Sequence, residues 1–157
     1  MYRLRRYRLN DIDAIAALFH DTVHLVCAKD YTPEQLNAWA DGSVDKAAWN
    51  ASLLAHHTLV AESGGVVIGF GDIDGDYLDR LYVHEGWQGR GVATAIVAAL
   101  EQHAQETGQT RMVTHVSVTA RPFFERRGFA VVKEQQAERK GVLLTNFVME
   151  KCWSNRA

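Results

Sequence analysis

The spacing of apolar residues changes several times along the chain, and each change predicts a different element. Apolar residues recur every three or four positions after Asn10, around Leu36 and after Gly91, which indicates amphipathic helices. Runs rich in Val, Ile, Leu, Tyr and Phe indicate strands, and Gly64-Gly65 separates two of these runs as a hairpin turn. The predicted strands cover residues 2–8, 58–63, 66–73, 77–83, 111–117, 129–135 and 143–151, and the predicted helices cover 10–27, 32–41, 45–54, 91–107 and 119–127.

Local signals mark several boundaries of these elements. Asn10 suits a helix N-cap, because its side chain can accept a hydrogen bond from a free amide of the first turn. Thr32, Pro33 and Gln35 form a capping box with proline at the first helical position. The charged segment 136–141 is expected to be a flexible loop that joins two closing strands.

Length and charge indicate one domain over residues 1–157. The chain is 47% hydrophobic and 23% charged, which is ordinary for a globular protein of this size. A net charge of −2 excludes a broad electrostatic footprint for nucleic acid. Arg3, Arg5, Arg6 and Arg8 cluster locally, but they fall on both faces of the first predicted strand, so we expect a solvated edge.

The two cysteines and the basic start of the chain bear on compartment. Cys27 and Cys152 are far apart and lack metal-ligand spacing, so they indicate reduced thiols, and we expect no metal. Polar residues interrupt the chain after Arg8, which argues against a signal peptide, and no run approaches the roughly 18 apolar residues of a membrane span. We expect a cytoplasmic protein that binds no membrane, and the sequence leaves its oligomeric state open, a homodimer included.

The strand 77–83 leads into a glycine-rich turn, Gln88-Gly89-Arg90-Gly91-Val92-Ala93, which opens a helix. Small residues let the backbone approach a ligand closely, and the free amides at a helix N-terminus suit phosphate. The turn lacks the Gly-Lys-Ser/Thr ending of a nucleotide P-loop. It also has Thr94 where a dinucleotide fingerprint needs Gly or Ala, so that interpretation is poor.

Two blocks of the chain resemble the GNAT superfamily of N-acetyltransferases. The spacing Gln88-x-x-Gly91-x-Ala93 resembles its acetyl-coenzyme A signature, and residues 120–129, Ala-Arg-Pro-Phe-Phe-Glu-Arg-Arg-Gly-Phe, resemble its later helix-and-turn segment. The order of elements is similar over nearly the whole chain, notably to small bacterial members with Phe-Phe in this block. The resemblance implies an α+β fold: a mixed, mostly antiparallel sheet of six to seven strands, with helices on both faces.

The resemblance also implies acetyl-CoA as co-substrate. The turn amides would hold its pyrophosphate, and its pantetheine arm would lie along the preceding strand, with Ser117 as a further contact. Phe124 stands where the superfamily often places a tyrosine that protonates the leaving thiolate, and phenylalanine cannot donate a proton. The implied cofactor residues are Leu81, Tyr82, Val83, Gln88, Gly89, Arg90, Gly91, Val92, Ala93, Thr94, Ser117 and Phe124.

Candidates for the general base and the general acid come from the strand before the turn. Regular alternation would put Tyr77, Asp79, Leu81 and Val83 on one face, where residues of the superfamily approach the acceptor amine. Asp79 is then a candidate base and Tyr77 a candidate phenolic acid, with His115 on the next strand as a third candidate. A structural ion pair of Asp79 with an arginine, and a wall role for Tyr77, remain open.

The resemblance implies an acceptor pocket bounded by the segment that joins the first two helices and by the last hairpin. This prediction brings in Asp30, Tyr31 and Trp39, with Asn146 and Phe147 from the hairpin. An aromatic lining with one or two acids favours a flat or weakly basic small-molecule amine. A protein or peptide amine, and a regulator that binds acyl-CoA without turnover, are the alternatives.

Overall fold

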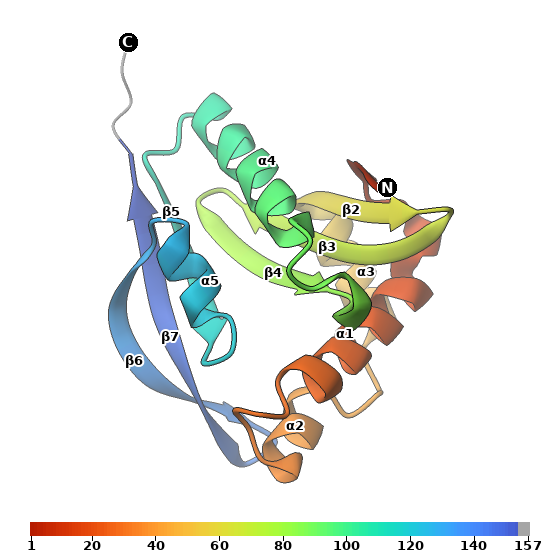
Figure 1. Ribbon diagram of the computed structural model, residues 1–157, viewed down its shortest axis with the longest axis vertical. Helices are drawn as coiled ribbons and strands as arrows, with labels where there is room; N and C mark the ends of the chain where they lie inside the picture. Colours follow the sequence, from red (N-terminus) through yellow and green to blue (C-terminus); the bar gives the residue numbers. More distant parts are fainter. Residues whose placement is uncertain (154–157) are drawn as a thin grey trace.

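The computed structural model describes residues 1–153, which form one sheet with helices on both faces (Figure 1). The strands are β1 Arg3–Arg6, β2 His57–Ser63, β3 Val66–Asp74, β4 Tyr77–Val83, β5 Arg111–Ser117, β6 Ala130–Arg139 and β7 Val142–Cys152. The helices are α1 Ile12–Val26, α2 Pro33–Trp39, α3 Lys46–Ala55, α4 Val92–Glu106 and α5 Arg121–Arg126, with short 3₁₀ turns at Leu9–Asp11 (η1) and Glu85–Trp87 (η2).

The sheet has the strand order β1-β2-β3-β4-β5-β7-β6, and its pairs are antiparallel except for β4 with β5. That parallel pair is short, since it joins only Tyr77 to Val113 and Leu78 to Thr114. Beyond this point the two strands no longer pair, so they diverge. The predicted fold class is therefore confirmed, and the sheet is split at its centre.

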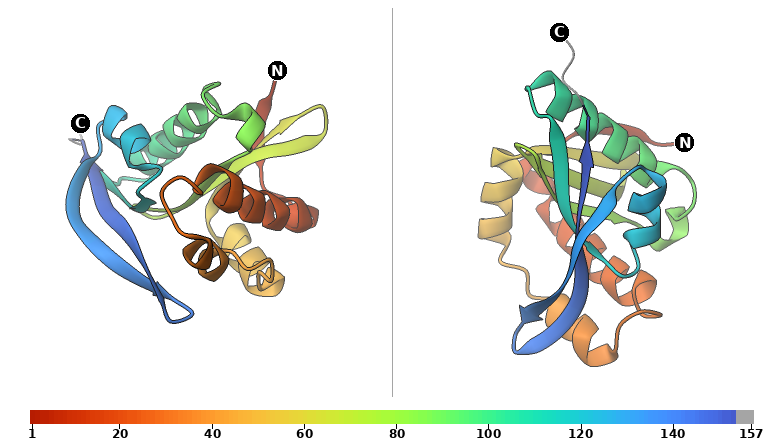
Figure 2. Two further views of the ribbon diagram at one scale, coloured as in Figure 1. Left: turned by 60° about the horizontal axis from the view of Figure 1, so that its bottom comes forward. Right: turned by 90° about the vertical axis from the view of Figure 1, so that its left-hand side faces the viewer.

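Two sets of buried side chains cover the two faces of the sheet. Residues of α4, together with Phe124 and Phe129, form the largest cluster on one face. Helices α1, α2 and α3 lie on the other face, as the turned views in Figure 2 show, and their residues contribute to two further clusters. None of the helices in the described part of the chain has both the length and the apolar run that crossing a membrane requires.

Glycines in β3 allow α4 to approach the sheet closely. A Cβ added to Gly71 would lie 2.8 Å from Ile96 Cγ2 of α4 and 3.2 Å from the Arg80 carbonyl oxygen. A Cβ on Gly69 would lie 3.3 Å from Val92 Cγ1 at the start of the same helix. These two positions bring the N-terminal half of α4 against β3 and β4.

The start of α1 differs from the sequence prediction. The residue that makes side-chain hydrogen bonds before α1 is Asp11 and not Asn10. The Asp11 carboxylate accepts two hydrogen bonds of 2.8 Å from Arg5 and one from the backbone N–H of Arg8. Arg5 also pairs with Glu62, and its side chain is only 14% exposed. The edge-strand prediction holds for β1, but Arg5 is a buried partner of two carboxylates instead of a solvated charge.

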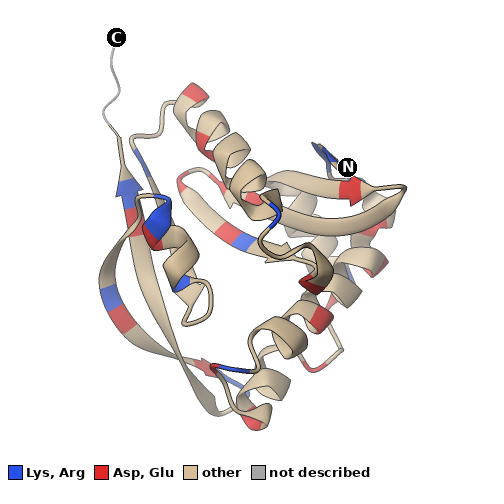
Figure 3. Ribbon diagram, viewed as in Figure 1, with Lys and Arg blue, Asp and Glu red and all other residues tan. Residues whose placement is uncertain are grey.

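The closing hairpin is longer and tighter than predicted. Strands β6 and β7 pair as far as Arg139 with Val142, so the expected flexible loop is a turn at Lys140 and Gly141, both with positive φ. Charged side chains in this segment lie on the exposed outer strand, where the backbone pairs while the charges stay in water. The charged residues of this segment therefore indicated a solvent-exposed strand and not a loop without regular structure (Figure 3).

Candidate active site

Two cavities adjoin where β4 and β5 diverge. A cleft of about 740 Å³ runs from the η2–α4 turn to α5, and all of the predicted cofactor residues except Arg90 line it. A second cavity of about 450 Å³ lies between β4, α2 and the β6–β7 hairpin. We call them the cofactor cleft and the acceptor cavity. The residues that line both are Trp39, Asp79, Tyr82, His115 and Ser117.

The glycine-rich turn shapes one end of the cofactor cleft. Gly89 and Gly91 have φ values of 71° and 84°, and a Cβ at either position would meet nothing within 4 Å. Glycine is therefore favoured here by backbone conformation and not by lack of space. The Ala95 N–H donates to the Gly91 carbonyl over 3.0 Å as the first helical bond, which leaves the preceding amides of α4 without helical acceptors.

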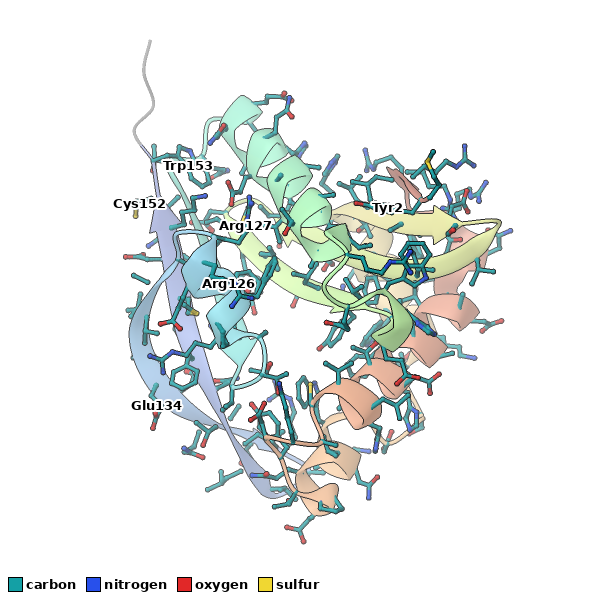
Figure 4. The ribbon with its side chains drawn as sticks, in the orientation of Figure 1. Tyr2, Arg126, Arg127, Glu134, Cys152 and Trp153 are labelled. Carbon is teal, nitrogen blue, oxygen red and sulfur yellow. The ribbon has the colours of Figure 1, made fainter. Side chains whose placement is uncertain are left out.

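Side chains around the turn hold its shape. The Gln88 side-chain amide donates to the Val83 carbonyl over 2.6 Å, so that carbonyl is already engaged. The Arg90 guanidinium lies 4.0 Å from the centre of the Trp87 ring and does not line the cleft. Arg126 of α5 does line it, without an ion pair among the described residues (Figure 4). Two cations among the described residues therefore line the cleft, Arg126 of α5 and Lys29 just after α1, and the sequence analysis named neither.

A β-bulge changes the orientation of the predicted catalytic strand. Ile73 pairs with Leu78 and Asp72 with Arg80, so Asp79 is the extra residue of β4. Leu78, Leu81 and Val83 consequently contact the α4 core, while Tyr77 lines only the acceptor cavity. The predicted single face of alternating residues is wrong, because a bulge shifts the alternation by one position. Asp79 itself lines both cavities.

Asp79 borders a charged cluster but is loosely held within it. Arg80 Nη1 lies 2.5 Å from the buried Asp72, and His56 Nδ1 lies 2.8 Å from the same carboxylate. Asp79 is 3.7 Å from Arg80 Nη2 and 4.0 Å from His56 Nδ1, and its side chain is 31% exposed. The structural ion pair of this strand is therefore chiefly Arg80 with Asp72, and Asp79 keeps acceptor capacity toward the cavities.

Two tyrosines flank Asp79. Burial, with smaller effects from Asp79 and Asp72, raises the pKa of Tyr77, whose ring centre lies 5.5 Å from that of His115. Burial also raises the pKa of Tyr82, and the neighbouring Trp39 side chain only partly opposes this rise. Both phenols therefore stay protonated at neutral pH.

The positions at the start of α5 have structural roles as well. The Ser117 hydroxyl oxygen accepts a bond of 3.0 Å from the Ala120 N–H, which leaves its proton free to donate. Phe124 contributes to the lining of the cleft, but it is only 3% exposed. Its ring packs edge-to-face on Phe123 and Phe129, with centres 5.2 and 5.1 Å away. Phe124 is thus mainly a core residue.

The predicted acceptor residues separate into two groups. Tyr31 and Trp39 line the acceptor cavity, but the Tyr31 hydroxyl already donates to the Thr145 carbonyl and accepts from the Val118 N–H. Asp30 lies outside both cavities and accepts a hydrogen bond from Thr119. Phe147 is in the core.

The hairpin also supplies a hydrogen-bond acceptor to the acceptor cavity. Asn146 lines it, and its side-chain oxygen is buried without a hydrogen-bond partner. Sequence reasoning missed further lining residues, because they come from four different elements: Phe19, Trp49, Arg80 and Arg139.

Comparisons with known proteins agree with this geometry. A family model for the acetyltransferase (GNAT) domain matches residues 27–151. The N-acetyltransferase YafP of Escherichia coli, itself uncharacterized, is 33% identical over 94% of this chain and 93% of its own length. A GCN5-related N-acetyltransferase structure from Rhodopseudomonas palustris has a TM-score of 0.92 at 35% identity, and covers 96% of this chain and 94% of its own.

A more distant structure shares the fold alone. The PaiA N-acetyltransferase of Thermoplasma acidophilum, solved in complex with coenzyme A, has a TM-score of 0.79 at 17% identity and covers 98% of this chain and 99% of its own. The family model and the closer relatives extend over most of the chain, including both the turn and the α5 block. The chain belongs to the GNAT superfamily of N-acetyltransferases.

Proposed function

We propose that this protein transfers the acetyl group of acetyl-CoA to an amine of a small molecule. The observation that carries the proposal is the junction of the two cavities at Asp79, with a helix N-terminus suited to phosphate at the far end of one. The carbon–nitrogen bond forms as the carbon–sulfur bond breaks, and one proton moves from the amine nitrogen to the sulfur. Residues at the junction can act on both partners.

The residues of the cofactor cleft fit acetyl-CoA. Amides of Val92, Ala93 and Thr94, with the positive end of the α4 dipole, would hold the pyrophosphate. The edge of β4 beyond Leu78 has no β5 partner, so an extended ligand can lie between the two strands. Arg126 offers a cation beside the cleft in place of Arg90. When bound, acetyl-CoA supplies the activated thioester.

Asp79 and Tyr82 are the side chains that we assign to the proton steps. Asp79 is a carboxylate with unused acceptor capacity at the junction, so it can take a proton from the amine directly or through water. Tyr82 lines both cavities and keeps its phenolic proton because burial raises its pKa, which suits it to protonating the sulfur. Tyr77, the acid expected from the sequence, lines only the acceptor cavity and remains the second candidate.

Contacts that join the β6–β7 hairpin to α2 beside the acceptor cavity favour a small molecule over a protein chain. Lys140 at the hairpin turn pairs with Asp41 after α2, and Gln35 of α2 donates to the Leu143 carbonyl over 2.9 Å. These contacts join the hairpin to α2 over one side of the cavity. The aromatic walls agree with a flat amine, which need not be strongly basic.

Turnover of acetyl-CoA with a panel of amines tests the proposal. Thiol release and the mass of the acetylated product would be measured with arylamines, polyamines, amino acids and peptides. Asp79→Asn should lower kcat roughly 10²–10⁴-fold with little change in acetyl-CoA affinity. Asp74→Asn is the matched control, because Asp74 also faces His56 but lines neither cavity.

Two further results bear on the assignment. Tyr82→Phe should reduce kcat more than Tyr77→Phe, and the reverse order would return the acid role to Tyr77. Binding of acetyl-CoA with no product from any amine would contradict an enzyme and favour a regulator that binds acyl-CoA. Equal activities of Asp79→Asn and Asp74→Asn would remove Asp79 from the chemistry.

A further inference from the structure

The acceptor cavity contains more positive charge than the sequence analysis foresaw. Three cations line it, from β4 and from the tip of the β6–β7 hairpin: Arg80, Arg139 and Lys140. Two of them have carboxylate partners, since Arg80 pairs with Asp72 and Lys140 pairs with Asp41. Arg80 is further engaged by the Ser52 hydroxyl, to which it donates over 2.7 Å. Their charges are therefore largely offset within the protein.

Arg139 is the exception among these cations. Its guanidinium donates to the Glu138 carbonyl over 3.0 Å and forms no ion pair with any residue of the described chain. Burial is the main cause that raises the pKa of Tyr77, Asp79 adds to this rise, and the charge of Arg139 partly opposes it. The Tyr77 phenol, which lines the acceptor cavity, thus lies within electrostatic reach of both Arg139 and Asp79.

The same cavity also offers hydrogen-bond acceptors. Asp79 has no partner closer than 3.7 Å, and the buried Asn146 side-chain oxygen has no donor at all among the described residues. A buried acceptor without a donor is unfavourable, so a ligand N–H at this place would be favoured. Asp79 also lines the cofactor cleft, whereas Arg139 lines only the acceptor cavity, at the hairpin end away from the acetyl donor.

We propose that the acceptor is an amino acid-like molecule, with a carboxylate bound by Arg139 and an amine facing Asp79 and Asn146. This inference rests on the function proposed above and specifies its substrate class. A planar guanidinium pairs with a carboxylate through two parallel hydrogen bonds, which orients the bound molecule as well as holding it. Phe19, Trp39 and Trp49 provide an apolar wall for the body of the molecule. A cavity of about 450 Å³ is in the range of small-molecule sites.

Pairs of amines that differ only by a carboxylate test the proposal. The full-length protein would be assayed for thiol release with phenylalanine against phenethylamine, and with 4-aminobenzoate against aniline. We expect the carboxylate to raise kcat/KM about 10- to 100-fold in at least one pair, the range for a hydrogen-bonded charge pair. Titration calorimetry of the same compounds, in the presence of CoA, measures binding independently of turnover.

Variants at the hairpin separate a specific contact from a general effect. Arg139→Gln should abolish the preference for the carboxylate, so that the two amines of a pair react with similar kcat/KM. Arg139→Lys should retain part of the preference, because it keeps the charge but loses the two-pronged geometry. Lys133→Gln is the matched control: it removes a cation from the same strand outside the cavity and should change neither amine.

Each outcome decides a different point. Turnover of neutral and carboxylated amines at equal rates, or a uniform loss in Arg139→Gln, overturns the carboxylate inference and leaves the acetyltransferase proposal intact. Failure of every amine to react contradicts the proposed function. In that case the calorimetry still decides: weaker binding of the carboxylate by Arg139→Gln supports the anion site, and no binding of either pair overturns it.

Discussion

Replacing Gly91 by aspartate tests whether the turn before α4 binds the cofactor phosphates. Gly91 has a φ of 84°, where a residue with a Cβ costs roughly 1–2 kcal/mol, while the space around it is open. Gly91→Ala therefore carries the backbone cost alone, and Gly91→Asp adds a negative charge at the amides of α4. Comparison of the two variants separates strain from electrostatic repulsion.

The magnitudes follow from ligand linkage. Acetyl-CoA at about 100 times its Kd stabilises the native state by about 2.7 kcal/mol, which raises Tm by roughly 5–11 °C for a domain of this size. Differential scanning fluorimetry with and without acetyl-CoA measures this shift. Gly91→Ala should have a lower Tm without ligand but keep most of the shift, whereas Gly91→Asp should lose it. A full shift in a folded Gly91→Asp variant would refute the assignment of the phosphate site to this turn.

Three further changes test the fold. Gly71→Ala should cost about 1–3 kcal/mol in urea denaturation, because its Cβ would overlap Ile96; an unchanged midpoint would mean that α4 can move away. Phe124→Ala should cost about 3–5 kcal/mol, and a small loss would show that the ring faces the cleft instead of the core. Burial opposes ionisation of Asp11, but hydrogen bonds from Arg5 and a backbone amide outweigh it and lower its pKa. Its ionised form thus stabilises the fold above about pH 4, and that stability is lost as pH falls through the lower folded-state pKa. Asp11→Asn should reduce this loss of urea midpoint between pH 5 and pH 2; an unchanged pH profile would contradict the assignment.

Elements governed by neighbouring residues were predictable. The capping box is formed as expected, with Gln35 N–H donating to the Thr32 hydroxyl and the Thr32 N–H donating to the Gln35 side chain. The strands at 77–83 and 111–117 have the predicted bounds. The glycine-rich turn begins α4 within one residue of the expected position. In each case the interacting groups lie within a few positions of one another, so a short stretch of sequence includes all the residues that determine the element.

The catalytic strand shows where such a window is insufficient. A period of two puts Tyr77 and Leu81 on one face, and nothing local signals that Asp79 is inserted as a bulge. The bulge results from the register of β4 against β3, which depends on pairing between two strands at once. The same limit applies to Arg126, which reaches the cofactor cleft only because α5 packs across from α4.

The sequence alone therefore predicted the family and the sheet-and-helix architecture correctly, because these follow from periodicity, caps and two short motifs. Phosphate binding by the turn before α4 stays a prediction. The chemistry at the centre depended on folding. Divergence of β4 from β5 creates the two cavities, and the bulge at Asp79 directs one carboxylate toward both. The hairpin places Arg139 and Asn146 on the same acceptor cavity as Asp79, although both lie more than 55 positions after Asp79 in the sequence. Contacts between groups so distant along the chain arise from packing and register, which no local pattern encodes.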